Sequence, residues 1–261
     1  MRYFKNFSGR TSTLGRRSLV VSLLAILAFS SIASATPLAG TTVANPGDTV
    51  FVPCLGLLCS PNADAPGTLL ASLVAPYSFS TTAGLTSGTL VSAVFKNSSG
   101  TLDFYYQVNN CFQAGIAAFC PGAAASATAI ARETDTSFVG FMTFLGFRPD
   151  GSTLAGSLFV DGSVAPVTAD RSTLGPGSTL GFQFSPPDSA KILPGLSSNV
   201  VIISTDAKFF KAGNADVIDG GTQTVASFQP STGVPEPASL ALLGLGLLAI
   251  GGVGRKLKSR R

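Results

Sequence analysis

The chain has 261 residues, enough for one sizeable domain or two small ones that bury a core without a metal ion. Its formal charge of +4 comes from its ends, because residues 36–234 hold seven bases and twelve acids and carry about −5. Nucleic-acid binding requires clustered Lys and Arg, so this charge distribution argues against a nucleic-acid partner.

The first predicted element, residues 1–35, has the layout of a cleavable secretory signal peptide. Basic residues precede an apolar stretch from Leu19 to Phe29, and the small-residue triplet Ala33-Ser34-Ala35 follows. A helix over that stretch is about 16 Å long, too short for a hydrocarbon core of ~30 Å. We therefore predict export through the secretion translocon and cleavage after Ala35, with the mature chain starting at Thr36.

Between the terminal segments, apolar and polar residues alternate in short runs separated by Gly, Pro, Asn and Asp, a pattern typical of strands and turns. The ranges expected as strands are Thr49–Val52, Thr68–Val74, Tyr77–Thr82, Thr89–Phe95, Leu102–Val108, Phe138–Phe147, Leu154–Val160, Thr179–Phe184, Val200–Ser204 and Thr224–Phe228. This spacing predicts an all-β fold, a single antiparallel β-sandwich or jelly-roll-like domain over residues 36–233. The alanine-rich segment Gly122–Arg132 is also compatible with a helix and is left undecided.

All four cysteines, Cys54, Cys59, Cys111 and Cys120, lie in the part predicted to be exported, where disulfides form. Three pairings are open, and short loops favour Cys54–Cys59 with Cys111–Cys120. A zinc site is the alternative, but no cysteine pair has two-residue spacing and the chain has no histidine.

Tyr105 and Tyr106 are the candidate aromatic platform for stacking on a sugar. Adjacent residues of a strand point to opposite faces, so one of the two is expected to be exposed and the other to pack in the core. The 19 phenylalanines are expected to fill the space between two sheets.

The lack of histidine excludes serine triads, cysteine–histidine dyads and histidine-ligated metals. The only catalytic groups left to consider are carboxylates, and a glycosidase would need a pair of them across the scissile bond. The triplet Asp135-Thr136-Ser137 resembles the catalytic loop of an aspartic protease, but it lacks the glycine of that loop and the chain has no second copy of it. Asp216 and Asp219 have oxygens suited to calcium, although a role as exposed turn residues explains them better. We expect no catalytic residue, no cofactor and no metal site.

The last predicted element, residues 234–261, combines three parts. Val234-Pro235-Glu236-Pro237 is followed by Ala238–Val253, sixteen residues without charge, and then by a basic cluster over residues 255–261. An apolar helix of that length measures about 24 Å and spans a bilayer only marginally. The basic cluster favours the cytoplasmic side.

Pro235-Glu236-Pro237, the apolar helix and the basic terminus, in this order, resemble a PEP-CTERM sorting domain over about a tenth of the chain. The resemblance implies processing by an exosortase in the inner membrane of Gram-negative bacteria that make extracellular polysaccharide. We therefore expect a non-catalytic exported protein of the cell envelope, outer surface or extracellular matrix. It would associate with exopolysaccharide after transient anchoring in the inner membrane through residues 238–253. A carbohydrate-binding module and a secreted hydrolase that uses aspartates are the alternatives.

Overall fold

The computed structural model describes residues 41–42, 47–55, 66–111, 120, 126–173 and 177–233. The chain divides into Met1–Ser34 and Ala35–Arg261, and every described residue belongs to the second part. The predicted signal peptide with Ala33 and Ala35, and the predicted tail from Val234 onward, lie outside the described residues.

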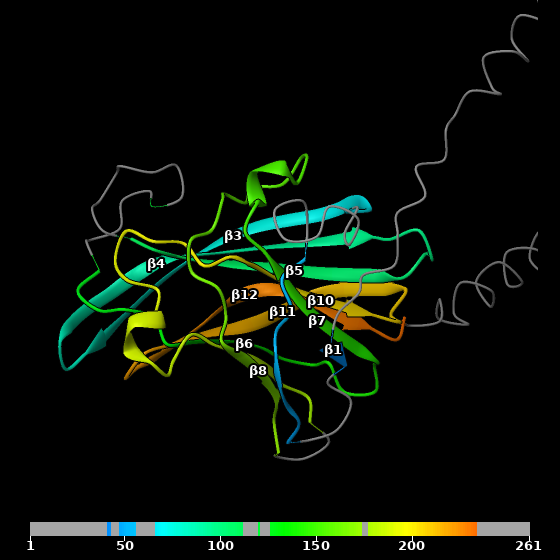
Figure 1. The fold of residues 1–261 in the computed structure, drawn as a ribbon. Coiled ribbons are helices and arrows are strands. Elements are labelled where there is room, and N and C mark those ends of the chain that lie inside the picture. Colours follow the sequence, from blue (N-terminus) through cyan, green and yellow to red (C-terminus); the bar gives the residue numbers. More distant parts are fainter. Residues whose placement is uncertain are drawn as a thin grey trace, which may run out of the picture. The chain divides into compact units, whose positions relative to one another are not determined.

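The described residues form two six-stranded antiparallel sheets, which confirms the all-β antiparallel prediction (Figure 1). The first sheet has the order β1-β7-β10-β5-β4-β3 and the second has the order β12-β11-β6-β9-β8-β2. The strands are β1 (Thr41–Thr42), β2 (Thr49–Phe51), β3 (Thr68–Thr81), β4 (Gly84–Lys96), β5 (Leu102–Asn110), β6 (Arg132–Asp135), β7 (Thr143–Arg148), β8 (Thr168–Arg171), β9 (Leu180–Gln183), β10 (Val200–Thr205), β11 (Phe209–Ile218) and β12 (Thr222–Ser231). Two short 3-10 helices, η1 (Gly151–Thr153) and η2 (Asp188–Ala190), complete the described elements.

Strands β3 and β4 form a long hairpin, so the two strands predicted around Pro76 are one. Proline lacks the N–H that a sheet ladder needs, and β3 tolerates Pro76 because it lies at the edge of the first sheet. The Tyr77 side chain crosses β4 at Gly88 and its hydroxyl donates a hydrogen bond to the Asn109 carbonyl on β5 (3.0 Å). A Cβ at position 88 would collide with the Tyr77 ring, so glycine is required there.

The main hydrophobic cluster draws buried side chains from both sheets. The first sheet contributes Tyr106 and Val201, and the second contributes Phe182 and Val217. Strand alternation places these residues on one face of each strand. The shared cluster explains why the apolar residues of both sheets are removed from water.

A second cluster lies on the opposite face of the first sheet, where Tyr105 packs with Leu154 and Phe159. Leu154–Val160 was predicted as a strand, and this prediction is wrong. Leu154 and Phe159 bury against the sheet from the irregular segment that follows η1, whereas Leu158 is 46% exposed. Gln107 fixes this segment, because its amide nitrogen donates to the Val160 carbonyl (2.8 Å) while its amide oxygen accepts from the Val160 N–H (3.0 Å).

Strands β1, β6, β8 and β11 were not predicted from the sequence. β6 and β8 have four residues each, three of which are charged in β6 and two in β8, so their apolar alternation is weak. The undecided segment Gly122–Arg132 contains no helix within its described residues, and β6 begins at its last residue. The predicted strand Phe138–Phe147 is shorter than expected, because β7 begins at Thr143.

Candidate functional site

The tyrosine pair is not a surface platform, because Tyr105 and Tyr106 are both fully buried. The two side chains do point to opposite faces of β5, as predicted, but both faces are covered. Tyr106 lies in the cluster shared by the two sheets, and its hydroxyl donates to the Phe228 carbonyl (2.7 Å). Tyr105 lies under the segment that follows η1. The expectation that one of them is exposed is therefore wrong.

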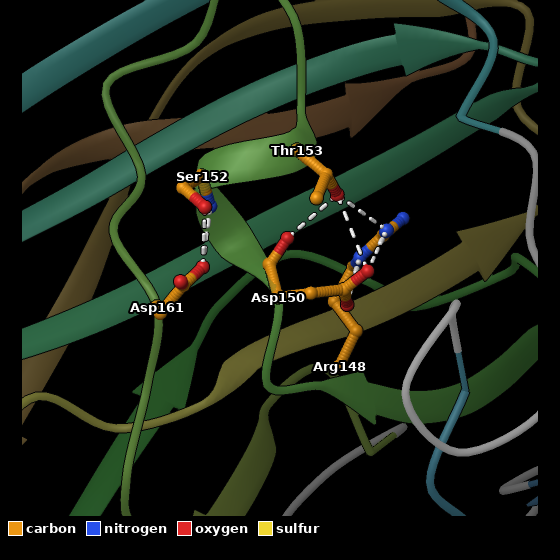
Figure 2. Close-up of polar contacts among 5 residues, drawn as sticks. All are labelled: Arg148, Asp150, Ser152, Thr153 and Asp161. Atoms are coloured by element: carbon orange, nitrogen blue, oxygen red, sulfur yellow. Dashed lines mark hydrogen bonds and ion pairs between the residues drawn. The ribbon is translucent and has the colours of Figure 1, made fainter.

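A buried ion pair holds that covering segment at the end of β7 (Figure 2). The Arg148 guanidinium donates to both carboxylate oxygens of Asp150, at 3.0 and 2.8 Å, and to the Thr153 hydroxyl at 2.9 Å. Burial raises the pKa of Asp150, but the hydrogen bond and charge of Arg148 outweigh it, and the net pKa is lowered. Beside this pair, the Ser152 hydroxyl donates to Asp161 (2.6 Å). These contacts anchor η1 and so keep Tyr105 covered.

Glu133 and Asp135 form an acid pair inside the core, a feature that no sequence signal identified. They stand two residues apart on β6, where the ladder pairs them with the buried residues Val217 and Ala215 of β11. None of their four carboxyl oxygens has a hydrogen-bond donor from another residue. Burial raises the pKa of Glu133 to about 7, and burial, followed by the charge of Glu133, raises that of Asp135. A proton on one carboxyl then allows it to hydrogen-bond the other.

A shallow polar groove of about 370 Å³ opens on the outer side of the second sheet. Arg132 on β6 reaches across β9 and donates to both oxygens of Asp170 on β8, at 2.5 and 2.7 Å. Gly181 on β9 permits this crossing, because a Cβ there would collide with the Arg132 guanidinium. The other residues that line the groove are Gly47, Thr49, Arg171, Ser172, Thr173 and Thr179.

The other acidic residues that the sequence analysis considered as candidate ligands or catalytic groups have structural roles in the described part of the chain. Asp216 accepts a hydrogen bond from Thr224 (2.5 Å), and Asp219 lies 3.4 Å from the Lys191 ammonium. Asp135 of the protease-like triplet Asp135-Thr136-Ser137 lies in the core beside Glu133 rather than in a cleft. Over the described ranges, no three His, Cys, Asp or Glu side chains are grouped so that they could hold a metal ion.

The structure confirms the Cys111–Cys120 disulfide, with Cα atoms 5.9 Å apart. Cys54 is also disulfide-bonded. Cys59 lies outside the described residues, so the predicted Cys54–Cys59 pairing stays a prediction.

The sorting segment starts where the second sheet ends. β12 ends at Ser231, and Gly233 follows with a left-handed φ of +72° while its N–H donates to the Ser231 hydroxyl (3.3 Å). The Gly233 backbone lies against the Phe209 ring, since a Cβ added at Gly233 would be 2.7 Å from its edge. No helix in the described residues is long and apolar enough to cross a membrane. Val234, Pro235, Glu236 and Pro237 come directly after this junction.

Comparison with known protein families gives a match at this junction. The PEP-CTERM protein-sorting motif matches residues 233–256, which begin at Gly233. Neither the curated proteins nor the solved structures gave a match to the chain. The chain therefore carries a PEP-CTERM protein-sorting motif directly after its last strand, and this motif implies an exported protein that an exosortase sorts to the cell surface.

Proposed function

We propose that this protein is a non-catalytic component of the cell surface or extracellular matrix, released from the membrane by an exosortase and associated with exopolysaccharide. The observation that carries the proposal is the sorting motif at residues 233–256, which follows the last strand of the second sheet. The two sheets share one hydrophobic cluster, which supports a single β-sandwich as the exported body.

The partners of the acidic side chains support a structural role for the domain. Asp150 and Asp170 each bind an arginine through both carboxylate oxygens, and Glu133 and Asp135 are enclosed in the core. A carboxylate that is held by arginine or shielded from water is poorly placed to transfer a proton to a polysaccharide.

The sorting step is tested in producing cells by replacing Glu236 with Ala. The expected result is that a precursor of full mass stays in the membrane fraction and the shorter surface form is lost. The matched control is Thr232→Ala, because Thr232 is exposed and precedes the motif. Normal release of the Glu236→Ala protein would contradict the proposal.

Saccharide binding is the second candidate, and the groove at Arg132 and Asp170 is the observation that favours it. Sugar hydroxyls pair well with planar charged groups and with hydroxyl side chains, both of which line this groove. Purified protein is incubated with polysaccharide from the producing cells, and retention and new reducing ends are measured. Saturable retention that Asp170→Asn abolishes would favour binding, whereas new reducing ends would support the hydrolase alternative and overturn the non-catalytic role.

A further inference from the structure

We propose that the end of the domain next to the sorting motif rests on the bilayer surface in the uncleaved precursor, with Met142 and Phe209 inserted among the lipids. We call this end the exit edge and define it as Met142, Asp206–Lys208, Phe209 and Ser231–Gly233. The inference rests on the proposed anchoring through residues 238–253, and it adds a lipid partner for the folded domain.

The exit edge is one connected surface, because pairing brings its segments together. β10 ends and β7 begins at the pair Thr205–Thr143, and the Met142 N–H donates to the Asp206 carboxylate (3.0 Å). Residues 206–208 then lead into β11, whose first residue, Phe209, pairs with Ser231. In Figure 1 the ends of β10 and β12 lie close together at this side of the domain.

Two large apolar side chains project from this edge into solvent. Met142 is 60% exposed and Phe209 is 57% exposed, although most large apolar residues of the domain are buried. Lys208 and Lys211 are exposed beside Phe209. Apolar side chains accompanied by lysines are the combination that binds an anionic lipid surface. Lys208 and Lys211 outnumber Asp206 here, so this edge is locally positive although the central domain as a whole carries about −5.

The length of the connection supports the lipid as the occupant. Six residues, 232–237, separate the last strand from the apolar segment that begins at Ala238. At ~3.5 Å per residue they span at most about 21 Å, and two of them are prolines. If residues 238–253 occupy the bilayer, the exit edge is held within that distance of it. The exposed apolar residues of the edge are therefore the part of the domain that meets the lipid.

Tryptophan reporters test this placement, because the chain contains no tryptophan. The full chain is prepared with Phe209→Trp or Met142→Trp and reconstituted in vesicles that contain brominated lipid, with about one anionic lipid in four. The matched control is Leu193→Trp, at a residue that is 48% exposed. Leu193 lies near the opposite end of β5 from the exit edge. The Leu102 N–H at one end of β5 donates to the Ala207 carbonyl of the exit edge, and the Asn110 N–H at the other end donates to the Leu196 carbonyl, close to Leu193. At ~3.4 Å per residue the two ends of β5 are about 27 Å apart.

We expect brominated lipid to quench the Phe209→Trp and Met142→Trp emission about twofold or more relative to Leu193→Trp. Circular dichroism confirms the fold of each variant, and two reporters keep the test valid if one substitution unfolds the domain. Equal quenching of the three tryptophan variants, with the protein still floating with the vesicles, would overturn the proposed contact between the exit edge and the lipid but not the anchoring. A blue-shifted but unquenched signal would mean that protein covers the edge, and would also overturn it. A chain that fails to float with the vesicles would overturn the anchoring itself.

Discussion

Replacing Glu133 with Gln is expected to flatten the dependence of stability on pH. The Glu133 side chain is 1% exposed, and no other residue donates a hydrogen bond to either of its oxygens. Burial raises its pKa from 4.5 to about 7, with smaller opposing effects from Asp135 and Arg132 and a small further rise from Asp216. The Tyr106 hydroxyl on β5 donates to the Phe228 carbonyl and not to the Glu133 carboxyl.

The sign of the effect follows from proton binding. Between pH 4.5 and about 7 the folded protein keeps a proton on Glu133 that the unfolded chain has lost, so the free energy of unfolding falls as pH rises. A rise of the pKa from 4.5 to about 7 corresponds to about 3.5 kcal/mol in total, of which about 3 kcal/mol falls between pH 4.5 and 8. Asp135, whose pKa is also raised, adds a loss in the same direction. Glutamine has no proton to lose and can donate its amide hydrogen to Asp135.

The assay is urea unfolding followed by far-UV circular dichroism between pH 4.5 and 8, on wild type and Glu133→Gln. The expected result is that the variant loses about 3 kcal/mol less stability than wild type over this range. Asp188→Asn is the matched control, because its side chain is 89% exposed and the wild-type slope should persist. Parallel profiles for wild type and Glu133→Gln would refute the assignment of a buried, protonated acid.

Three further predictions concern the ion pair, the disulfide and the signal. Asp150→Asn leaves the buried Arg148 charge uncompensated and is expected to lower the free energy of unfolding by about 3 kcal/mol in urea titrations. Because the pKa of Asp150 is lowered, its contribution should disappear as pH falls below about 4, and an unchanged acid profile would count against the pair. Replacing Cys111 and Cys120 with Ser opens a loop of sequence separation 9 and is expected to cost about 2.5 kcal/mol, measured by the same titration. Stability equal to that of wild type would contradict it. N-terminal sequencing of the exported protein is expected to begin at Thr36, and a distant start would disprove cleavage after Ala35.

The sequence alone determined the features that depend on local order along the chain. The Pro235-Glu236-Pro237 motif with its apolar and basic neighbours is readable because sorting signals are recognised as linear segments. Most strands were predicted because the alternation of apolar and polar residues is a local pattern. The Cys111–Cys120 disulfide was predicted on the same basis, since short loops close easily.

Only the tertiary structure decided which surfaces are covered and which charged groups meet. Tyr105 is buried because η1 and the segment after it cover its face of the sheet. That segment is anchored by Arg148, about 40 residues further along the chain. Arg132 meets Asp170 because β9 lies between their strands and carries Gly181 at the crossing point. Burial and pairing are properties of contacts between strands that are distant in sequence. The alternation within one strand fixes two faces but does not say what covers each of them.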